Sequence, residues 1–348
     1  MIKTLTSWSI LLLFVVAIYH CNQEWLMEPT KAAVSIFFIS SGFLLSMKHP
    51  IERVSWAGWK RFVGDHALKI YPLQWLGLAA LLVFQLIFIV PEIDWWLTTH
   101  VALVQSWIPI RDVYFGYNGH SWFLASLMFC YICYPPLSAL GHRLRLHWQC
   151  LAMGAVIVVF WWRLSGTAPS TREFLYVYPL VRIWDFVLGM VLYRLYQAAS
   201  RTSFTPGRWK ATLIEAAMVL FFLELIIINQ RVEYTHPYED FLLWWAPMGT
   251  LVFGSAMLNG HEGYIGRMLL WRPLQWLGRL GFEIYIFQSI AALIFNYMVA
   301  PVCGHFGLMV YGDYAWGMIP ILIVLAWAVN RWFSRPLNAW LKRHRQAA

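Results

Sequence analysis

Ten long apolar segments, separated by short polar or basic stretches, dominate the hydrophobic pattern of this chain. About 17 to 25 residues poor in charge suffice for a helix to cross the hydrocarbon core of a bilayer. The pattern predicts helical spans at residues 6–22, 32–48, 71–91, 119–140, 149–165, 177–197, 211–230, 242–260, 280–301 and 313–334. An even number of spans places both termini on one side. We therefore expect an all-α, polytopic membrane helix bundle with about ten transmembrane helices.

The composition agrees with this prediction. Of the 348 residues, 60% are apolar and 12% are charged, and the mean hydropathy is +0.56. Soluble globular domains carry about a quarter of their residues as charged side chains, so a soluble globule is excluded. The sequence shows no long linker, repeat or low-complexity tract, so we expect residues 1–348 to form one transmembrane domain without a separate soluble domain. No small-x-small cleavage pattern follows the first apolar segment, so we expect it to be retained as a span.

The distribution of basic residues predicts the orientation of the chain. The net charge of +9 by itself is compatible with nucleic-acid binding. If the N-terminus is cytoplasmic, however, 20 of the 26 lysines and arginines fall on the inner side. The exceptions are Lys31, Arg111, Arg172 and Arg231 on the outer side, and Arg163 and Arg182 at membrane depth. Because cytoplasmic loops are enriched in Lys and Arg, we expect both termini in the cytoplasm. This predicts a multi-pass protein of the bacterial cytoplasmic (inner) membrane, with lipids rather than nucleic acid as partners.

Four costly polar side chains fall in the outer half of the predicted bilayer. His20 ends an outgoing span, His120 begins an incoming one, and Arg182 and Asp185 lie early in another incoming one. Ionisable groups at membrane depth usually face the bundle interior or a water-filled cavity. Arg182 and Asp185 are three residues apart and can pair on one helix face. We expect one polar site here, and both a structural and a direct functional role for the Arg182–Asp185 pair stay open.

Two further motifs resemble reactive sites, but their positions indicate a structural role. Cys130 and Cys133 form a CxxC inside an apolar helix without a second pair of ligands, so we interpret them as small core residues and expect no metal site. His120 and Ser121 are neighbours, but adjacent residues on a helix point about 100° apart and do not face each other. A serine hydrolase is therefore a poor interpretation of this pair.

Three carboxylates and one aromatic loop also lie in or beside the predicted spans. Glu215 and Glu283 lie near the inner surface, where we expect them to be solvated, whereas Glu224 is deeper and is a candidate for lining a cavity. The outer segment 91–119 is rich in Trp and Tyr. This composition is typical of an interfacial aromatic belt and predicts a helix lying among the headgroups.

Seven short motifs, in this order, cover nearly the whole chain and resemble those of one family. They are Leu5-Thr6-Ser7-Trp8 with the apolar run to His20, Phe37-Phe38-Ile39-Ser40-Ser41-Gly42-Phe43-Leu44, Lys69-Ile70-Tyr71-Pro72, Ser121-Trp122-Phe123-Leu124, the segment from Arg182 to Met190, Leu277-Gly278-Arg279-Leu280-Gly281, and Arg335-Pro336. The chain resembles the acyltransferase-3 family, the integral-membrane O-acyltransferases of bacterial surface and secreted sugars. Each motif is weak alone, and the shared order carries the resemblance.

The resemblance implies ten core helices, an acyl-CoA donor from the cytoplasm, a glycan hydroxyl as acceptor, and His20 as the catalytic histidine. Two positions depart from the family pattern. The family typically places an arginine eleven residues before the histidine, three helical turns away on the same face, and here that residue is Ser9. Where members often carry a histidine in the ninth span, this chain has Gln288. Lys3, Lys69 and Arg61 are candidate replacements for the arginine.

For catalysis we predict that His20 acts as general base on the acceptor hydroxyl. An imidazole with a pKa near 6.5 suits deprotonation at neutral pH. Asp185 is a candidate for orienting an imidazole or holding Arg182, and Arg182 or His120 for stabilising the oxyanion of the tetrahedral intermediate. Direct transfer and an acyl-histidine intermediate both stay open, and no metal is expected.

The donor is predicted to be acetyl-CoA or a similar short acyl-CoA. The inner loop 49–70 and the following turn hold its candidate binding residues, Lys60, Arg61, Lys69 and Tyr71. Clustered basic side chains neutralise phosphates, although the same charges also suit anionic lipid. Because CoA arrives from inside and His20 lies outward, we predict a pore joining His20 to the basic inner face.

Two other functions remain open at this point. A bundle with buried charges is compatible with a flippase for a lipid-linked sugar or a proton-coupled exporter, for which inverted repeats are typical, but the sequence contains no internal repeat. The serine at position 9 keeps an inactive relative that scaffolds a glycan synthase as a third possibility.

Overall fold

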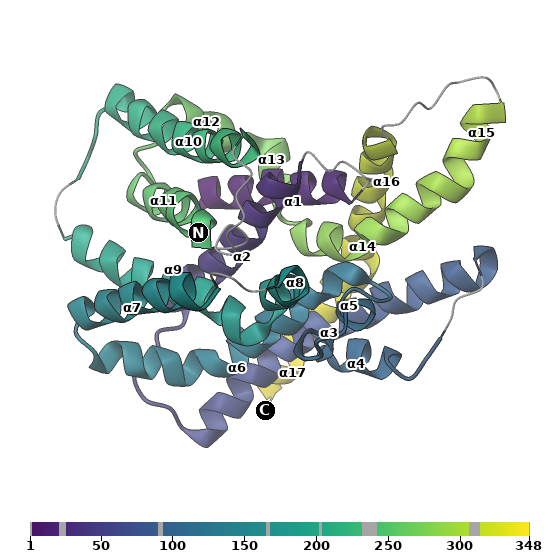
Figure 1. The fold of residues 1–348 in the computed structure, drawn as a ribbon, viewed down its shortest axis with the longest axis horizontal. Helices are drawn as coiled ribbons and strands as arrows, with labels where there is room; N and C mark the ends of the chain where they lie inside the picture. The colour runs from purple at the N-terminus through teal and green to yellow at the C-terminus, as the bar shows by residue number, and fades with distance from the viewer. Residues whose placement is uncertain are drawn as a thin grey trace.

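The computed structural model describes residues 2–20, 26–89, 93–164, 168–201, 204–231, 242–305 and 314–347. Within these ranges all regular structure is helical and no strand occurs, so the predicted all-α class is confirmed. Figure 1 shows helices from the two ends of the chain side by side, with α1 (Lys3–Tyr19) between α10 (Arg208–Arg231) and α16 (Tyr314–Val329).

Each of the ten predicted segments overlaps a helix. Besides α1, α10 and α16, these helices are α2 (Met27–Lys48), α3 (Trp56–Phe88), α6 (Trp122–Arg143), α7 (Leu146–Leu164), α9 (Pro179–Ala199), α11 (Leu242–Met257) and α14 (Gly281–Ile294). Shorter elements connect them. They are α4 (Leu97–Ala102), α5 (Arg111–Tyr114), α8 (Pro169–Val177), α12 (Tyr264–Leu269), α13 (Arg272–Gly278), α15 (Ala300–His305), α17 (Arg335–Ala347), the 3₁₀ turns η2 (Gln105–Trp107) and η3 (Gly119–Ser121), and the π-helical segments η5 (Phe295–Val299) and η6 (Asn330–Ser334).

In the described part of the chain, six helices are long and apolar enough to cross a membrane. They cover residues 27–48, 56–88, 119–143, 208–229, 281–305 and 317–343. A bent pair, Ser170–Val177 followed by Pro179–Ala199, passes the same test as one broken span. The apolar helices α1 and α11 are shorter, with 17 and 16 residues. These helices support a multi-pass membrane protein.

The bend between α8 and α9 has a local cause. Tyr178 precedes Pro179 and has an extended backbone, with φ −67° and ψ 125°. A residue before proline is pushed out of the helical region, whereas proline itself suits the first turn of the next helix. The two helices therefore meet at 49°, which turns α8 away from the line of α9.

The packing of α2 against α9 explains two of the sequence motifs. A Cβ atom added at Gly42 would overlap the carbonyl oxygen of Phe186, and one added at Gly189 would overlap that of Ile39. Small residues at membrane helix interfaces let two backbones approach closely. Phe38 and Phe186, which flank this contact, are fully buried. The two motifs are therefore matched packing surfaces.

A second pair of motifs packs α1 against α13, and α1 also contacts the end of α12 at Leu269. The Ser7 hydroxyl donates to the Leu269 carbonyl, and Gln275 Nε2 donates to Ser7 Oγ at 2.7 Å. A Cβ atom added at Gly278 would overlap the Thr6 side chain. These contacts fix the N-terminal half of α1, whose C-terminal end leads to His20.

The three carboxylates do not behave as the sequence suggested. Glu215 and Glu283 are buried, with 6% and 4% of their surface exposed, so the expectation of solvation is wrong. Glu215 Oε1 accepts from the Gly263 backbone N–H at 2.8 Å, and Glu283 Oε1 accepts from Asn330 Nδ2 at 2.8 Å. Each carboxylate therefore joins two segments that are distant in the sequence. Glu224 is exposed and lines neither cavity described below.

The outer aromatic segment contains several short helices rather than one long helix. Tyr71 of α3 donates its hydroxyl proton to the Ala102 carbonyl at 2.8 Å. His100 Nε2 lies 2.8 Å from the Val113 carbonyl oxygen, and because that oxygen only accepts, Nε2 carries the proton. Burial lowers the pKa of His100 to about 4, so this imidazole stays neutral. The segment is thereby pinned to the helices beneath it.

Candidate functional site

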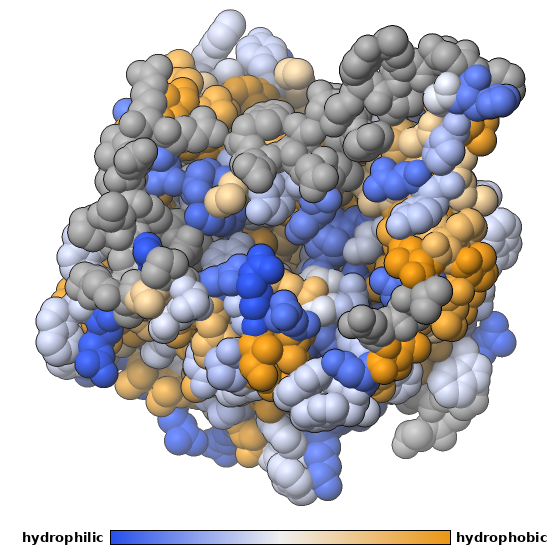
Figure 2. Space-filling model, turned by 45° about the vertical axis from the view of Figure 1, so that its right-hand side comes forward, coloured by the Kyte–Doolittle hydropathy of each residue, from blue (hydrophilic) through white to orange (hydrophobic). Residues whose placement is uncertain are grey.

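A cavity of about 590 Å³ lies at the C-terminal end of α1. Figure 2 shows hydrophilic side chains gathered in the hollowed middle of this face, beside an apolar margin. The cavity is lined by Val16, Tyr19, His20, Met27, Thr30, Lys31, Val34, Arg111, Phe115, His120, Trp122, Ser170, Arg172, Glu173, Tyr176 and Tyr285. Segments that are distant in the sequence therefore converge on one chamber.

His20 occupies the point where α1 ends. Its backbone N–H donates to the Val16 carbonyl at 3.2 Å, closing the last turn. The residue is exposed, and its side chain lines the cavity. The imidazole is thus accessible to a bound molecule while its main chain is held by the helix.

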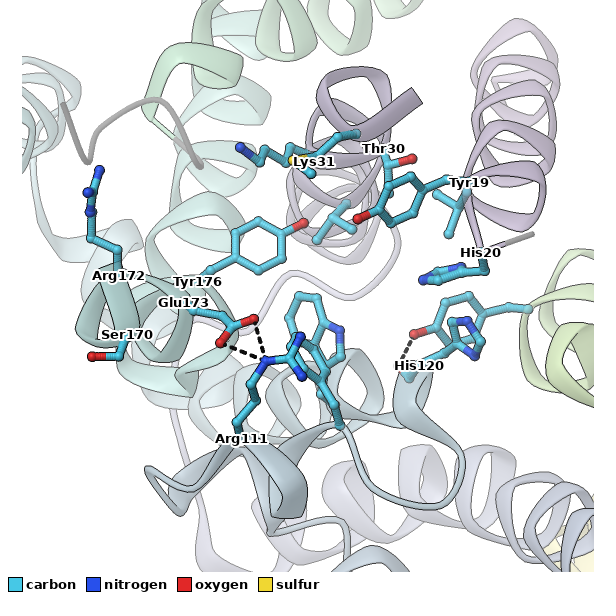
Figure 3. A pocket seen from close by; sticks show the side chains of 16 residues that line it. Tyr19, His20, Thr30, Lys31, Arg111, His120, Ser170, Arg172, Glu173 and Tyr176 are labelled. Atoms are coloured by element: carbon cyan, nitrogen blue, oxygen red, sulfur yellow. Dashed lines mark hydrogen bonds and ion pairs between the residues drawn. The ribbon is translucent and has the colours of Figure 1, made fainter. Parts of the chain in front are cut away.

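His120 meets His20 across the cavity wall. The two ring centroids are 3.8 Å apart and the ring planes cross at 82°, an edge-to-face contact that Figure 3 shows at one end of the chamber. η3, which carries His120, is a tight turn that aims the ring back toward α1. The structure therefore brings together two of the four candidate catalytic residues.

Three polar residues support the His120 ring and backbone from behind. Ser289 Oγ lies 2.9 Å from His120 Nδ1 and 3.1 Å from Asn118 Oδ1. Asn118 Oδ1 is also 3.4 Å from His120 Nδ1. The Tyr285 hydroxyl donates to the His120 carbonyl. Sequence reasoning missed these partners, although Tyr285 and Ser289 are four residues apart and so lie on one face of α14.

Gln288, the position where the resemblance leads one to expect histidine, is 1% exposed on α14. Its amide lies beside the His20 imidazole. It completes no well-formed hydrogen bond to a described residue. The departure from the family pattern therefore falls next to the catalytic histidine candidate.

Arg182 and Asp185 form the predicted pair, but away from the cavity surface. Arg182 Nη1 is 3.5 Å from Asp185 Oδ2, and neither side chain has any exposed surface. Trp245 Nε1 donates to Asp185 Oδ1 at 3.1 Å. The guanidinium lies 5.0 Å from each of the Phe38 and Tyr176 ring centroids. Since Tyr176 lines the cavity, the ion pair sits behind the wall and the structure separates it from His20.

The other end of the chamber is rich in charge. Arg111 Nε lies 3.1 Å from each carboxylate oxygen of Glu173, and the Tyr114 hydroxyl donates to Glu173 Oε2 at 3.0 Å. Burial and the neighbouring Glu173 carboxylate raise the pKa of Tyr114, so it keeps its proton and remains a donor. Figure 3 shows Arg111 and Glu173 opposite the histidine pair.

Two more cations line the chamber. Lys31 Nζ forms an ion pair with Glu28 at 2.9 Å. Arg172 has a buried Nε that no described residue satisfies. Together with Arg111, these are three of the four basic residues that the charge pattern places outside. That pattern was the one sequence signal for this end of the site, and it did not show that the three converge.

A second cavity, of about 280 Å³, follows α1 toward its N-terminal end. Its walls include Leu5, Ser9 and Leu13 from α1 and hold no Lys, Arg, Asp or Glu. It shares Tyr285 with the first cavity. Where we predicted one pore, the structure has two chambers along α1 that share Tyr285.

The four candidate donor-binding residues, Lys60, Arg61, Lys69 and Tyr71, all lie on α3 and line neither chamber. Lys60 Nζ lies 4.6 Å from the centroid of the Trp56 ring, and the Tyr71 hydroxyl is occupied by Ala102. Arg61 and Lys69 are exposed. Their role toward CoA stays a prediction.

Metal ligation has no support in the part of the chain that the structure describes, where no group of three His, Cys, Asp or Glu side chains is placed to hold an ion. Cys130 is buried and Cys133 is half-buried, and both are free thiols on α6.

A family model described as an acyltransferase domain, that of the acyltransferase-3 family, matches residues 5–331. The chain belongs to the acyltransferase-3 family. It is 29% identical over 178 residues to the acyltransferase MdmB of Streptomyces mycarofaciens, a match that covers 46% of this chain and 45% of that protein. The chain therefore matches less than half the length of this curated relative. No solved structure matches significantly.

In this acyltransferase-3 protein the resembling motifs divide into two groups. Those built on Gly42, Gly189 and Gly278 are contacts between helices. Those that end at His20 and begin at Ser121 deliver the histidine pair to the cavity.

Proposed function

We propose that the protein is a membrane O-acyltransferase that moves an acetyl or similar short acyl group from cytoplasmic acyl-CoA to a hydroxyl of an extracytoplasmic or lipid-linked polysaccharide. The observation that carries the proposal is the contact of the His20 and His120 rings at one end of a polar chamber of about 590 Å³. A neutral imidazole is suited to take a proton from a hydroxyl at neutral pH. Membership of the acyltransferase-3 family supports the class of reaction.

In the proposed reaction, the His20 imidazole removes the proton from the acceptor hydroxyl as its oxygen attacks the thioester carbonyl carbon. A new C–O bond forms, and the carbonyl oxygen carries the negative charge of the tetrahedral intermediate. When the C–S bond breaks, the carbonyl returns and the thiolate of CoA takes the proton. General base catalysis of this kind contributes about 10² to 10⁴ in rate. Arg182 and Asp185 act indirectly, by holding Tyr176 and α9 in place.

The donor path is proposed to follow α1. The ten predicted spans, with both termini cytoplasmic in a bacterial inner membrane, place Ser9 on the inner side of His20, about 16 Å away along the helix axis. The inner chamber then receives the pantetheine arm, and its neutral lining agrees with an uncharged ligand. Lys60, Arg61, Lys69 and Tyr71 remain the proposed contacts for the CoA phosphates. For the thioester to reach His20, it has to pass Tyr285, which lines both chambers.

The acceptor is proposed to enter the outer chamber. Tyr19, Trp122 and Tyr176 supply ring faces, and the cations Lys31 and Arg172 stand at its walls. Such a lining suits a sugar, whose rings pack on aromatic faces and whose hydroxyls and acidic groups bind polar side chains.

The test compares acyl esters on the host's surface glycan in four strains: one without the protein, and others with wild type, His20→Ala or His147→Ala. His147 is a matched control because it is exposed on α7 and lines neither chamber. Membrane abundance is measured by immunoblot. We expect esters with wild type and His147→Ala and none with His20→Ala at equal abundance.

Esters unchanged by His20→Ala would remove the assignment of the base. Esters in no strain would favour the transporter or scaffold alternatives. Release of free CoA from acetyl-CoA by purified protein, with the host glycan fraction as acceptor, separates an enzyme from both.

A further inference from the structure

A chain of hydrogen bonds runs behind His120 and bears on which ring nitrogen carries the proton. The chain joins the Ile286 carbonyl, the Asn118 amide, the Ser289 hydroxyl and His120 Nδ1. Asn118 is 2% exposed. The consequence for His120 deepens the proposed function and rests on it.

The orientation of the Asn118 amide is decided by the group at its far end. The Ile286 carbonyl oxygen can only accept a hydrogen bond, and it lies 3.3 Å from Asn118 Nδ2. The amide nitrogen must therefore face Ile286. Asn118 Oδ1 then faces Ser289 and His120, at 3.1 and 3.4 Å.

Asn118 Oδ1 can also only accept, so either Ser289 or His120 has to donate to it. If Ser289 donates, its oxygen is left to accept from His120 Nδ1 at 2.9 Å. If His120 donates, Nδ1 again carries the proton. Two arrangements leave Nδ1 bare. If Ser289 donates to His120, the buried amide oxygen has no donor, and if Ser289 donates to Asn118, the lone pairs of Nδ1 and Ser289 Oγ face each other at 2.9 Å. A buried polar atom without a partner is costly, so both arrangements are disfavoured.

We infer that Asn118 and Ser289 are positioning residues that hold His120 as its Nδ1–H tautomer, so that Nε2 is a proton acceptor beside His20. In this tautomer the neutral ring has no N–H at Nε2 to offer an oxyanion. His120 therefore takes part in the proton transfer and does not stabilise the oxyanion. The proton from the acceptor hydroxyl is taken by the histidine pair, held there as an imidazolium, and given to the departing CoA thiolate.

If Asn118 and Ser289 set the tautomer of His120, removing both residues should be less harmful than removing Asn118 alone. A merely structural role does not predict this result. In Asn118→Leu the amide acceptor is lost, and Ser289 becomes free to donate to His120 Nδ1 and impose the other tautomer. Removing Ser289 as well, in Asn118→Leu/Ser289→Ala, releases the ring. The double variant should therefore be more active than Asn118→Leu. Ser289→Ala alone keeps Asn118 Oδ1 within 3.4 Å of Nδ1 and should retain most of the activity.

The experiment uses full-length purified protein, acetyl-CoA and the host glycan fraction, and measures kcat and KM from CoA release. We expect Asn118→Leu to lower kcat by about 10²-fold with little change in KM, and the double variant to recover about tenfold of that loss. Ser106→Ala is the matched control, because this buried hydroxyl donates to the Trp122 carbonyl at 3.0 Å and does not support the His120 ring. It should leave kcat unchanged.

Thermal unfolding in detergent checks that each variant is folded, and Asn118→Ala replaces Asn118→Leu if leucine prevents folding. Losses that simply multiply in the double variant would overturn the inference, as would a kcat for Asn118→Leu equal to that of wild type. An inactive wild-type protein would overturn the proposed function itself. The variants test the inference only when the wild-type protein is active.

Discussion

Two polar clusters, one open to the chamber and one behind its Tyr176 wall, show what separates a reactive site from an internal support. The His20–His120 pair opens into a chamber and is backed by neutral hydrogen-bonding groups. The Arg182–Asp185 pair has no exposed surface. Both clusters contain ionisable groups that the sequence places at one membrane depth. Access to the chamber, rather than residue type or depth, distinguishes them.

The sealed pair has an architectural consequence. Asp185 on α9 accepts from Trp245 on α11, and Arg182 lies against Phe38 on α2. Removing one partner of a buried ion pair leaves an uncompensated charge, whereas replacing both by apolar groups is often neutral. The pair therefore specifies how α2, α9 and α11 fit together, and its removal should affect folding more than chemistry.

The largest expected effect tests the open cluster. His20→Gln removes the proposed base from a side chain that faces the chamber, so kcat should fall by about 10² to 10⁴ with little change in stability. Steady-state CoA release and thermal unfolding of the same preparation measure the two quantities. If His20→Gln unfolds at a lower temperature but keeps full activity per folded molecule, His20 has a structural role. The contrast between the two clusters would then be wrong.

The next effect tests the sealed cluster. Asp185→Ala leaves Arg182 buried without its carboxylate, and we expect about 3 to 5 kcal/mol of lost stability. Arg182→Met/Asp185→Leu should recover most of it. Reversible unfolding in mixed micelles measures stability, and activity is expressed per folded molecule. If Arg182→Met/Asp185→Leu is stable yet inactive, the pair takes part in the reaction.

A smaller effect concerns the helix contact that carries the sealed pair. Gly189→Ala places a methyl group against the Ile39 carbonyl, so α2 and α9 must separate, at a cost of about 1 to 3 kcal/mol. Gly154→Ala is the matched control, because a Cβ atom there meets nothing within 4 Å. Equal melting temperatures for both variants would contradict the close packing of α2 and α9.

The smallest effect sharpens the description of the open chamber. Arg172 lines it, and its buried Nε has no partner among the described residues. Arg172→Ala should raise the KM for the glycan acceptor by about tenfold or less, as expected for one lost hydrogen bond to a charged group, with kcat unchanged. Arg172→Lys should lie between the two. A change confined to the KM for acetyl-CoA would place the donor at this end instead.

Local patterns carried much of the fold. Runs of apolar residues predict helices because only a helix satisfies its own backbone in hydrocarbon, and each of the ten predicted segments overlaps one. His20 was identified by the motif that leads to it. The buried state of Glu215 and Glu283 was missed because their donors, Gly263 and Asn330, are 48 and 47 residues away.

The sequence by itself determined the helical class, the family resemblance and the identity of the exposed histidine, because each depends on residues close together in the chain. The tertiary structure alone decided that His120 reaches His20, that Asn118 and Ser289 stand behind it, and that Arg182 and Asp185 are sealed away. These relations span up to 171 residues. They depend on which helix faces meet, and side-chain packing between distant segments sets that choice.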